Sequence, residues 1–393
     1  MVYDNDNFLV TGFVPTCRAS DAILALAGWT TAPSPGAHEI ARSHHLTGEL
    51  TPSIYLTILS DGWKHPMKPL RLAILSATGT AQKRTIPALV NSKLVTVSAI
   101  QGRNPEKLRD VSDKYGIQSI YTDEHKLLDE GSYDAVMICS PPYMHFSQAK
   151  RVIDRGTPCL LEKPAAMSAD ECNELSHIAA ERAVVVHVAH HLRHQDTYAR
   201  MQEILKNGEL DEIVTAYAEW SFKMNRSAPS AAWKLDPSKN GLSAMNDAGI
   251  HTVDAMIGLL GPGSLRGAAS VRRPEDKTHE TVDILCEQHE CLTHIRSSRL
   301  YGPSANDLRI NGTDGSIYAP GFFTEASSGS FDLTRAGKTE SVRHSSPNPY
   351  RVEVEDFARS VEGLTPLFPF TDLHDAGLAM SLIDATHQTI TST

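Results

Sequence analysis

Glu162, Lys163 and Pro164 follow a short apolar run, Cys159 to Leu161, which has the composition of a buried strand. Proline has no main-chain N–H and cannot continue a strand, so the chain must turn there and leave the two charged residues at the strand end. Burial lowers the pKa of a lysine, and such a lysine can transfer protons near neutral pH. Taken alone, these residues favour a solvated lysine that pairs with Glu162, and the functional interpretation gains weight only from the surrounding sequence.

A second group of polar residues lies much further along the chain. Asp247, His251 and Asp254 are spaced four and three apart, within a helix predicted from about Ala244 to Leu260. At this spacing the three side chains share one face of an α-helix. They could form a catalytic face with Lys163. The simpler alternative is an acidic residue that complements the helix dipole, next to a structural histidine.

The elements that must position these residues begin at Leu70. Apolar runs predict strands at residues 70–75, 94–100, 135–140, 159–161 and 184–190, with helical segments between them. This alternation is typical of a parallel sheet with crossover helices, a Rossmann-type α/β domain. Such sheets bind ligands at the carboxyl ends of their strands, where Glu162 and Lys163 are expected.

The turn after the first strand occupies the position of a dinucleotide-binding GxGxxG or GxGxxA loop. It reads Ser76, Ala77, Thr78, Gly79, Thr80, Ala81. Both leading glycines are replaced by small hydroxyl residues, whose hydroxyl groups could donate to phosphate oxygens instead. We therefore expect this loop, apart from its Ala77, to contact a dinucleotide.

Arg103 follows the second predicted strand, where NAD-binding folds usually place an acidic residue for the ribose 2′-hydroxyl group. No Asp or Glu is present at that strand end. An arginine there favours a 2′-phosphate, and hence NADP over NAD. The alternative is a surface arginine without a ligand.

Two further groups adjoin the predicted strands. Ser140, Pro141 and His145 belong to a stiff diproline loop over which a flat ring could lie, and we expect them to bind the cofactor. Four histidines cluster near the end of the domain, at positions 187, 190, 191 and 194. Adjacent strand positions send His190 and His191 to opposite faces, so we expect no metal. Arg193 is expected to link the two domains beside the cofactor.

The second half of the chain predicts an α+β domain. Strand patterns near residues 214–222, 281–286 and 291–297, and a hairpin at 308–318, indicate a large and mostly antiparallel open sheet. Such a sheet could form a substrate wall or a surface for a homodimer or tetramer. Helices are expected near residues 350–361 and 373–387.

Length and composition limit the number of domains, the kinds of partner and the cellular location. A chain of 393 residues predicts more than one domain: an extension of unknown role (1–66), a dinucleotide-binding domain (67–190) and a substrate domain (191–393). The net charge of −10 with scattered basic residues argues against nucleic acid. No apolar run is long enough for a membrane helix. Six cysteines without a CxxC pair favour a reducing, cytoplasmic location.

With these features the chain resembles the Gfo/Idh/MocA family of nicotinamide-dependent sugar and polyol oxidoreductases, from about Leu70 to the C-terminus. The resemblance is carried by residues 140–142 and 145, 162–164, 190–194, and 247, 249, 251 and 254. It implies that Lys163, Asp247 and His251 line the substrate site and that the Lys163–Pro164 peptide bond is cis. Trp233 and Lys234 are expected to contact the substrate.

The expected activity is hydride transfer between nicotinamide and a secondary alcohol or ketone of a sugar, inositol or related polyol, including nucleotide sugars and glycosides. In this hypothesis His251 or Lys163 takes the alcohol proton, and Asp247 orients the substrate or the histidine. Two alternatives stay open: an NAD-dependent glycoside hydrolase of the same family, and a non-catalytic regulator that binds a dinucleotide.

Overall fold

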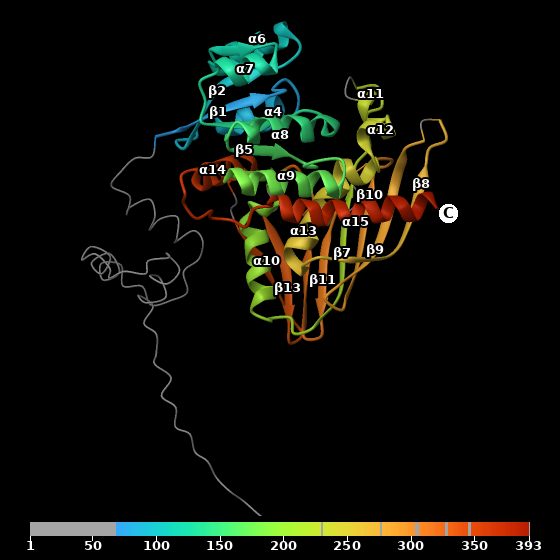
Figure 1. Ribbon diagram of the computed structural model, residues 1–393. Coiled ribbons are helices and arrows are strands. Elements are labelled where there is room, and N and C mark those ends of the chain that lie inside the picture. The colour runs from blue at the N-terminus through green and yellow to red at the C-terminus, as the bar shows by residue number, and fades with distance from the viewer. Residues whose placement is uncertain are drawn as a thin grey trace, which may run out of the picture. The chain divides into compact units, whose positions relative to one another are not determined.

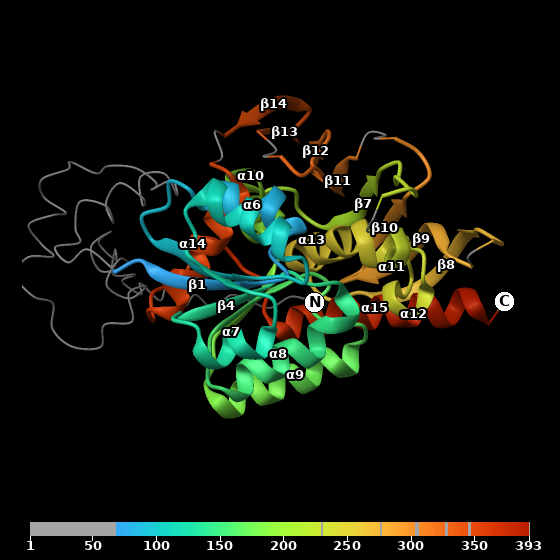
Figure 2. The ribbon, with the colours of Figure 1, turned by 90° about the horizontal axis from the view of Figure 1, so that it is seen from above.

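The computed structural model describes residues 68–392, except for 229–230, 276, 303–305, 327–328 and 345–346. The predicted extension, residues 1–66, lies outside the described residues. Figures 1 and 2 show the described part in two views at right angles.

The first half forms a parallel six-stranded sheet in the order β3-β2-β1-β4-β5-β6, the Rossmann order. Its strands are β1 (Leu70–Leu75), β2 (Val95–Gln101), β3 (Ser119–Tyr121), β4 (Ala135–Ile138), β5 (Cys159–Glu162) and β6 (Val186–Ala189). The predicted α/β domain is confirmed. Because all strands run in one direction, Glu162 ends β5 at the same edge as the turn after β1.

The crossover helices begin where the sequence supplies caps. They are α4 (Thr80–Lys83), α5 (Thr85–Leu89), α6 (Pro105–Tyr115), α7 (Glu124–Glu130), α8 (His145–Asp154) and α9 (Ala169–Arg182), with a short 3-10 turn, η1 (Pro142–Met144). Asn104 caps α6 and Ser168 caps α9 by accepting main-chain N–H groups. The helical segment expected after the first strand is present but divided, because the chain breaks at Arg84. Pro87 gives a reason, since it cannot donate to the carbonyl group of Lys83.

The second half forms an eight-stranded sheet in the order β14-β13-β12-β11-β7-β10-β9-β8. Its strands are β7 (Ile213–Ser221), β8 (Ser264–Arg272), β9 (His279–Gln288), β10 (Cys291–Ser298), β11 (Leu308–Gly312), β12 (Gly315–Ala319), β13 (Ser330–Arg335) and β14 (Lys338–Arg343). Only β7 and β10 pair in parallel, so the prediction of a mostly antiparallel sheet is confirmed. We did not predict β8, β13 or β14.

The remaining helices join the two sheets. They are η2 (His191–Arg193), α10 (Asp196–Lys206), α11 (Ala231–Lys234), α12 (Pro237–Asn240), the π-helical turn η3 (Met245–Gly249), α13 (Ile250–Leu260), α14 (Pro349–Val361) and α15 (Leu373–Thr391). In Figure 1, α15 lies beside α9 and next to the large sheet, in agreement with the contacts among these elements. Helix α15 therefore connects the two halves.

The hydrophobic cores also cross between the halves. Phe357 and Val354 of α14 pack with Leu72 and Ile74 of β1, so a C-terminal helix covers part of the Rossmann sheet. A second core joins the other face of this sheet to the large sheet and its helices. Because of this shared packing, the β5 end and the η3–α13 segment are held against one another.

No helix in residues 68–392, apart from the gaps given above, is both long and apolar enough to cross a membrane.

Candidate active site

Lys163 lies where β5 ends, and its ammonium group reaches the second half of the chain. Its Nζ donates to the main-chain carbonyl oxygen of Asp247 at 2.6 Å. The Lys163–Pro164 peptide bond is cis, as the family resemblance implied. The main-chain N–H of Lys163 donates to the carboxylate of Glu162 at 3.2 Å, so this carboxylate lies at the same strand end.

Asp247 lies in the π-helical turn η3, which runs directly into α13. Both of its carboxylate oxygens accept hydrogen bonds from Nζ of Lys234, at 2.7 and 2.8 Å. Lys234 also lies 5.5 Å from the ring centre of Trp233. The structure therefore brings together four of the expected substrate residues: Lys163, Trp233, Lys234 and Asp247. A π turn inside a helix is frequently associated with a functional site.

His251, the fifth expected substrate residue, is surrounded by aromatic rings. Its ring centre lies 5.2 Å from that of His190, 5.1 Å from that of His191 and 4.9 Å from that of Trp220. Its Nδ1 has no hydrogen-bond partner among the described residues. The prediction that His190 and His191 point to opposite faces is wrong, because β6 ends at Ala189 and both residues lie beyond the strand. In the described part of the chain, no three potential ligand side chains are grouped to hold a metal ion.

The environment of the site lowers the pKa values of Lys163, Asp247 and His251. Burial lowers the pKa of Lys163, although the charges of Asp247 and Glu162 act in the opposite direction. Burial opposes ionisation of Asp247, but the ammonium groups of Lys234 and Lys163 outweigh it and hold the pKa of Asp247 below its usual value. Burial and the charge of Lys163 place the pKa of His251 well below its usual value. His251 is therefore a neutral imidazole, whereas Asp247 is ionised.

Asp254 does not join this group, although its spacing predicted a shared helix face. Its carboxylate accepts two hydrogen bonds from Arg193, at 3.0 and 2.8 Å, and one from Thr371 at 2.8 Å. The π turn before α13 changes the rotation between Asp247 and Asp254. Asp254 still shares a helix face with His251, because both lie beside His190. Arg193 is 3% exposed and also pairs with Asp375 at 2.8 Å. Its nitrogens thus face protein groups, and it links η2 to α13 and α15.

The loop after β1 has one residue in a conformation that favours glycine, although both leading glycines of the dinucleotide pattern are replaced. Ser76 has a φ of +58°, a left-handed conformation that usually favours glycine. The side chain of Gln101 accepts a hydrogen bond from the N–H of Ser76 at 3.1 Å, which helps to hold this conformation. Gly79 and Thr80 are exposed at the start of α4, while Ala81 is buried.

Arg103 is exposed two residues after the end of β2, next to the loop after β1 because β1 and β2 are paired. The hydroxyl side chains of the loop, of which Thr80 is exposed, together with this guanidinium group fit the phosphates of a dinucleotide. The residues present are therefore compatible with NADP.

Ser140 and His145, expected as cofactor ligands, mainly contact protein groups. The hydroxyl of Ser140 donates to Gln148 at 2.6 Å. His145 is fully buried, and its ring nitrogens lie 2.7 Å from the carbonyl oxygens of Pro164 and Ser140. His145 thus ties the loop after β4 to the loop after β5. Pro141 in the same loop remains half-buried.

Sequence reasoning missed several residues around the site. Tyr350 stacks on His191, with ring centres 4.6 Å apart. Glu353, on the same helix, is buried beside the charges of Glu162 and Asp254, which with burial raise its pKa well above the usual value. Arg299 contacts both Lys234 and Asp247. No local pattern in the sequence marks these positions, since each is brought in by tertiary packing.

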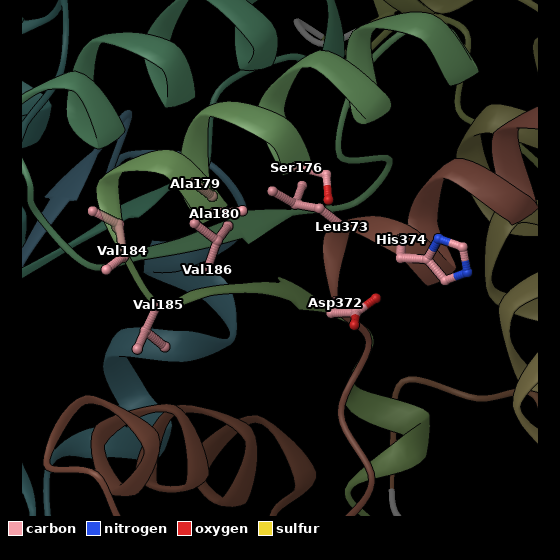
Figure 3. Close-up of a pocket in the computed structure, with 10 residues that line it drawn as sticks. Ser176, Ala179, Ala180, Val184, Val185, Val186, Asp372, Leu373 and His374 are labelled. Carbon is pink, nitrogen blue, oxygen red and sulfur yellow. The ribbon is translucent and has the colours of Figure 1, made fainter.

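A surface crevice lies away from this site (Figure 3). It is lined by Ser176, Ala179, Ala180, Ala183, Val184, Val185, Val186, Asp372, Leu373 and His374. These residues surround the amino end of β6, whereas Lys163 and the loop after β1 lie at the carboxyl edge of the sheet. The crevice is thus separate from the candidate active site.

The fold and the site define a protein with a Rossmann sheet, a second and mostly antiparallel sheet, and an ionisable cluster at the carboxyl edge of the Rossmann sheet. Comparison with known proteins agrees with this class. Residues 70–190 match the oxidoreductase family with an NAD-binding Rossmann fold, and residues 198–318 match the GFO/IDH/MocA C-terminal domain. The chain belongs to the Gfo/Idh/MocA oxidoreductase family.

Individual relatives support this membership. The chain is 28% identical over 321 residues to D-xylose 1-dehydrogenase (NADP(+)) 2 from Haloferax volcanii, covering 81% of this chain and 97% of that protein. It is 30% identical over 264 residues to an uncharacterized oxidoreductase from Synechocystis sp., and the match covers 63% of this chain and 71% of that protein. A crystal structure of a 3-ketoreductase from Actinomadura kijaniata with NADP and TDP-benzene covers 82% of this chain and 98% of its own, with a TM-score of 0.73 at 19% identity. This last likeness concerns the fold alone.

Proposed function

We propose that this protein is an NADP-dependent dehydrogenase or reductase that acts on a secondary alcohol or the corresponding ketone of a sugar, inositol or related polyol. The observation that carries the proposal is the hydrogen bond between the Lys163 ammonium group and the carbonyl oxygen of Asp247. It holds an ionisable group from the Rossmann edge against the segment that also bears His251. When bound, NADP supplies the nicotinamide ring that accepts or donates the hydride.

Lys163 is the proposed proton acceptor for the alcohol. Its lowered pKa increases the share of neutral amine near physiological pH, and a neutral amine can take the hydroxyl proton. In the reverse direction the ammonium group returns this proton to the ketone oxygen. Its positive charge also stabilises negative charge that develops on that oxygen.

His251 and Asp247 have different proposed roles. The neutral imidazole of His251 accepts or donates a hydrogen bond to the substrate hydroxyl group, since its Nδ1 has no partner among the described residues. Asp247 positions Lys163 through its carbonyl oxygen and Lys234 through its carboxylate. Trp233 and Lys234 then contribute an aromatic surface and a charged donor for the substrate.

NADP is favoured over NAD for two reasons. Arg103 occupies the position where a 2′-phosphate is bound in Rossmann domains. The name of the Haloferax volcanii relative also specifies NADP(+). Ser76, Thr78, Gly79 and Thr80 would face the phosphates, with Ala81 packed beneath them. Glu162 and Pro141 would complete the cofactor side from the neighbouring strand ends. Ser140, His145 and Arg193 would support it indirectly, through their contacts with protein groups.

We also propose that the chain forms a homodimer or tetramer through the large sheet, which carries exposed apolar side chains. Val214, Leu285 and Leu292 are 48, 38 and 45% exposed on β7, β9 and β10. Association of two copies would cover these side chains. Size-exclusion chromatography with light scattering tests this, and a monomer at micromolar concentration contradicts it. The cytoplasmic location stays a prediction from the cysteine pattern.

The proposed activity is tested by following NADPH absorbance with a panel of sugars, inositols, sugar acids and nucleotide sugars. We expect at least one secondary alcohol to reduce NADP, with one ketone formed for each NADPH. Retention of tight NADPH binding without turnover on the whole panel would contradict the enzymatic assignment.

A further inference from the structure

A buried ion pair lies behind the contact between Lys234 and Asp247. Arg299, directly after β10, donates from Nε and Nη2 to the two carboxylate oxygens of Glu280, at 3.1 and 2.9 Å. Glu280 belongs to β9, and the side chain of Arg299 has 0% exposed area. The pair therefore joins two neighbouring strands inside the protein.

The remaining nitrogen of Arg299 faces the candidate active site. Its Nη1 donates to the main-chain oxygen of Lys234 at 3.1 Å and lies 3.9 Å from Oδ2 of Asp247. Its charge also helps to lower the pKa of Asp247, after the effects of burial and the two lysines. One guanidinium group thus fixes the main chain of Lys234 and faces the carboxylate that Lys234 binds.

This arrangement depends on the shape of arginine. The planar guanidinium group has donors on opposite sides, so it can bond to Glu280 and to the Lys234 oxygen at the same time. A buried ion pair of this kind adds little net stability, because the loss of hydration offsets the attraction between the charges. The fixed direction of its hydrogen bonds is therefore the main effect of placing it here.

We propose that Arg299 and Glu280 are positioning residues for the reaction of Lys163. They hold Lys234 and Asp247 in place, and Asp247 in turn receives the Lys163 ammonium group on its carbonyl oxygen. This inference rests on the proposed function for its effect on turnover. Its effect on the position of Lys234 is measurable without turnover.

Two variants separate positioning from stability. Arg299→Lys keeps the charge but cannot bond to Glu280 and the Lys234 oxygen together. The double variant E280Q/R299M removes both charges of the buried pair at once. Arg226, which also donates to Glu280 at 3.0 Å, is partly exposed and can be hydrated in this variant. The matched control is R71M/D134N, because Arg71 bonds to Asp134 through the same two nitrogens, at 3.0 and 2.6 Å, far from the site.

Turnover is expressed per coenzyme site, counted by NADPH titration, so that unfolded protein does not contribute. We expect each Arg299 variant to lose about tenfold or more in kcat per site, because small misplacements of reacting groups have large effects on rate. The Kd for NADPH should change less than about twofold, and the control should keep its kcat within about twofold. A purely structural role would lower thermal stability without this loss of kcat per site.

Competitive acetylation with mass spectrometry provides the second readout. We expect Lys234 to react about threefold or more faster in both Arg299 variants than in wild type or the control, since its main chain and partner are released. If wild type turns over and the variants keep both kcat per site and Lys234 reactivity, the inference is contradicted while the proposed function stands. If wild type shows no turnover, the proposed function fails, and the reactivity of Lys234 alone decides the inference.

Discussion

The ammonium nitrogen of Lys163 lies 2.6 Å from the main-chain carbonyl oxygen of Asp247, although the two residues belong to different halves of the chain. The carboxylate of the same Asp247 holds Lys234 at 2.7 Å. Asp247 therefore acts on Lys163 in two ways, by fixing its position and by favouring its charged form. Burial of Lys163 acts in the opposite direction and is the larger influence on its pKa.

Replacing Asp247 with Asn is expected to shift the pH dependence of alcohol oxidation to lower pH. The Asp247 carboxylate raises the pKa of Lys163, so its removal lowers that pKa further. Oxidation requires neutral Lys163. The increase of the rate with pH should therefore occur at a lower pH in the variant than in the wild type. The profile of kcat from about pH 6 to about 10 measures this shift. An unchanged profile, or one displaced to higher pH, would contradict the proposed coupling; Asp154→Asn serves as a surface control.

Removing Arg103 is expected to reduce the preference for NADP. Arg103→Ala takes away the cation placed for a 2′-phosphate, so kcat/KM with NADP should fall by about tenfold or more while that with NAD changes little. Parallel assays with both coenzymes measure the ratio. Arg109, exposed on α6, provides the control variant R109A. Equal losses with both coenzymes, or no loss, would show that Arg103 does not bind the 2′-phosphate.

Breaking the Arg193–Asp254 pair is expected to destabilise the protein. Arg193→Met leaves the buried carboxylate of Asp254 without its cation, which typically costs about 3 to 5 kcal/mol of unfolding free energy. Urea unfolding measures the change. The exposed pair of Arg182 and Asp154, 3.4 Å apart, gives the control R182M, which should lose less than about 1 kcal/mol. Similar losses in the two variants would mean that burial of the Arg193 pair has no special energetic consequence.

Ionisation of the buried Glu353 carboxyl group should lower the free energy of unfolding as pH rises. Burial and the charges of Glu162 and Asp254 raise its pKa in the folded state above that in the unfolded chain. Its contribution is then present in full below the unfolded pKa of about 4.3 and is lost as pH rises through the folded pKa. Between about pH 5 and 8, the Tm of Glu353→Gln should therefore decrease less than the Tm of the wild type. An identical dependence of Tm on pH in the two proteins would refute this prediction. E362Q, at an exposed position, is the control variant.

The sequence was sufficient for the elements whose signals are local. The strand at 70–75 and the hairpin at 308–318 follow directly from apolar runs and glycines. The Glu162–Lys163–Pro164 motif likewise located the carboxyl end of β5, because a proline after an apolar run has few structural interpretations.

Other features depend on tertiary packing and have no local signal. The π turn at Asp247 changes the helix register before α13, so a spacing rule for α-helices does not hold between Asp247 and Asp254. His190 and His191 lie beyond the strand end, where alternation no longer applies. Arg299 and Glu353 have ordinary neighbours in the sequence, and only the packing of β10 and α14 brings them to the site.

We propose centrally that Lys163 accepts the proton of the substrate alcohol. The most direct test is the rate of NADPH formation by Lys163→Met with saturating NADP and substrate. The Lys163→Met variant should show a decrease in kcat of about a thousandfold, since loss of a general base typically lowers the rate by two to four powers of ten. The Kd for NADPH should stay within about threefold, and surface control K150M should match wild type. Formation of NADPH by Lys163→Met at the wild-type rate would contradict the account.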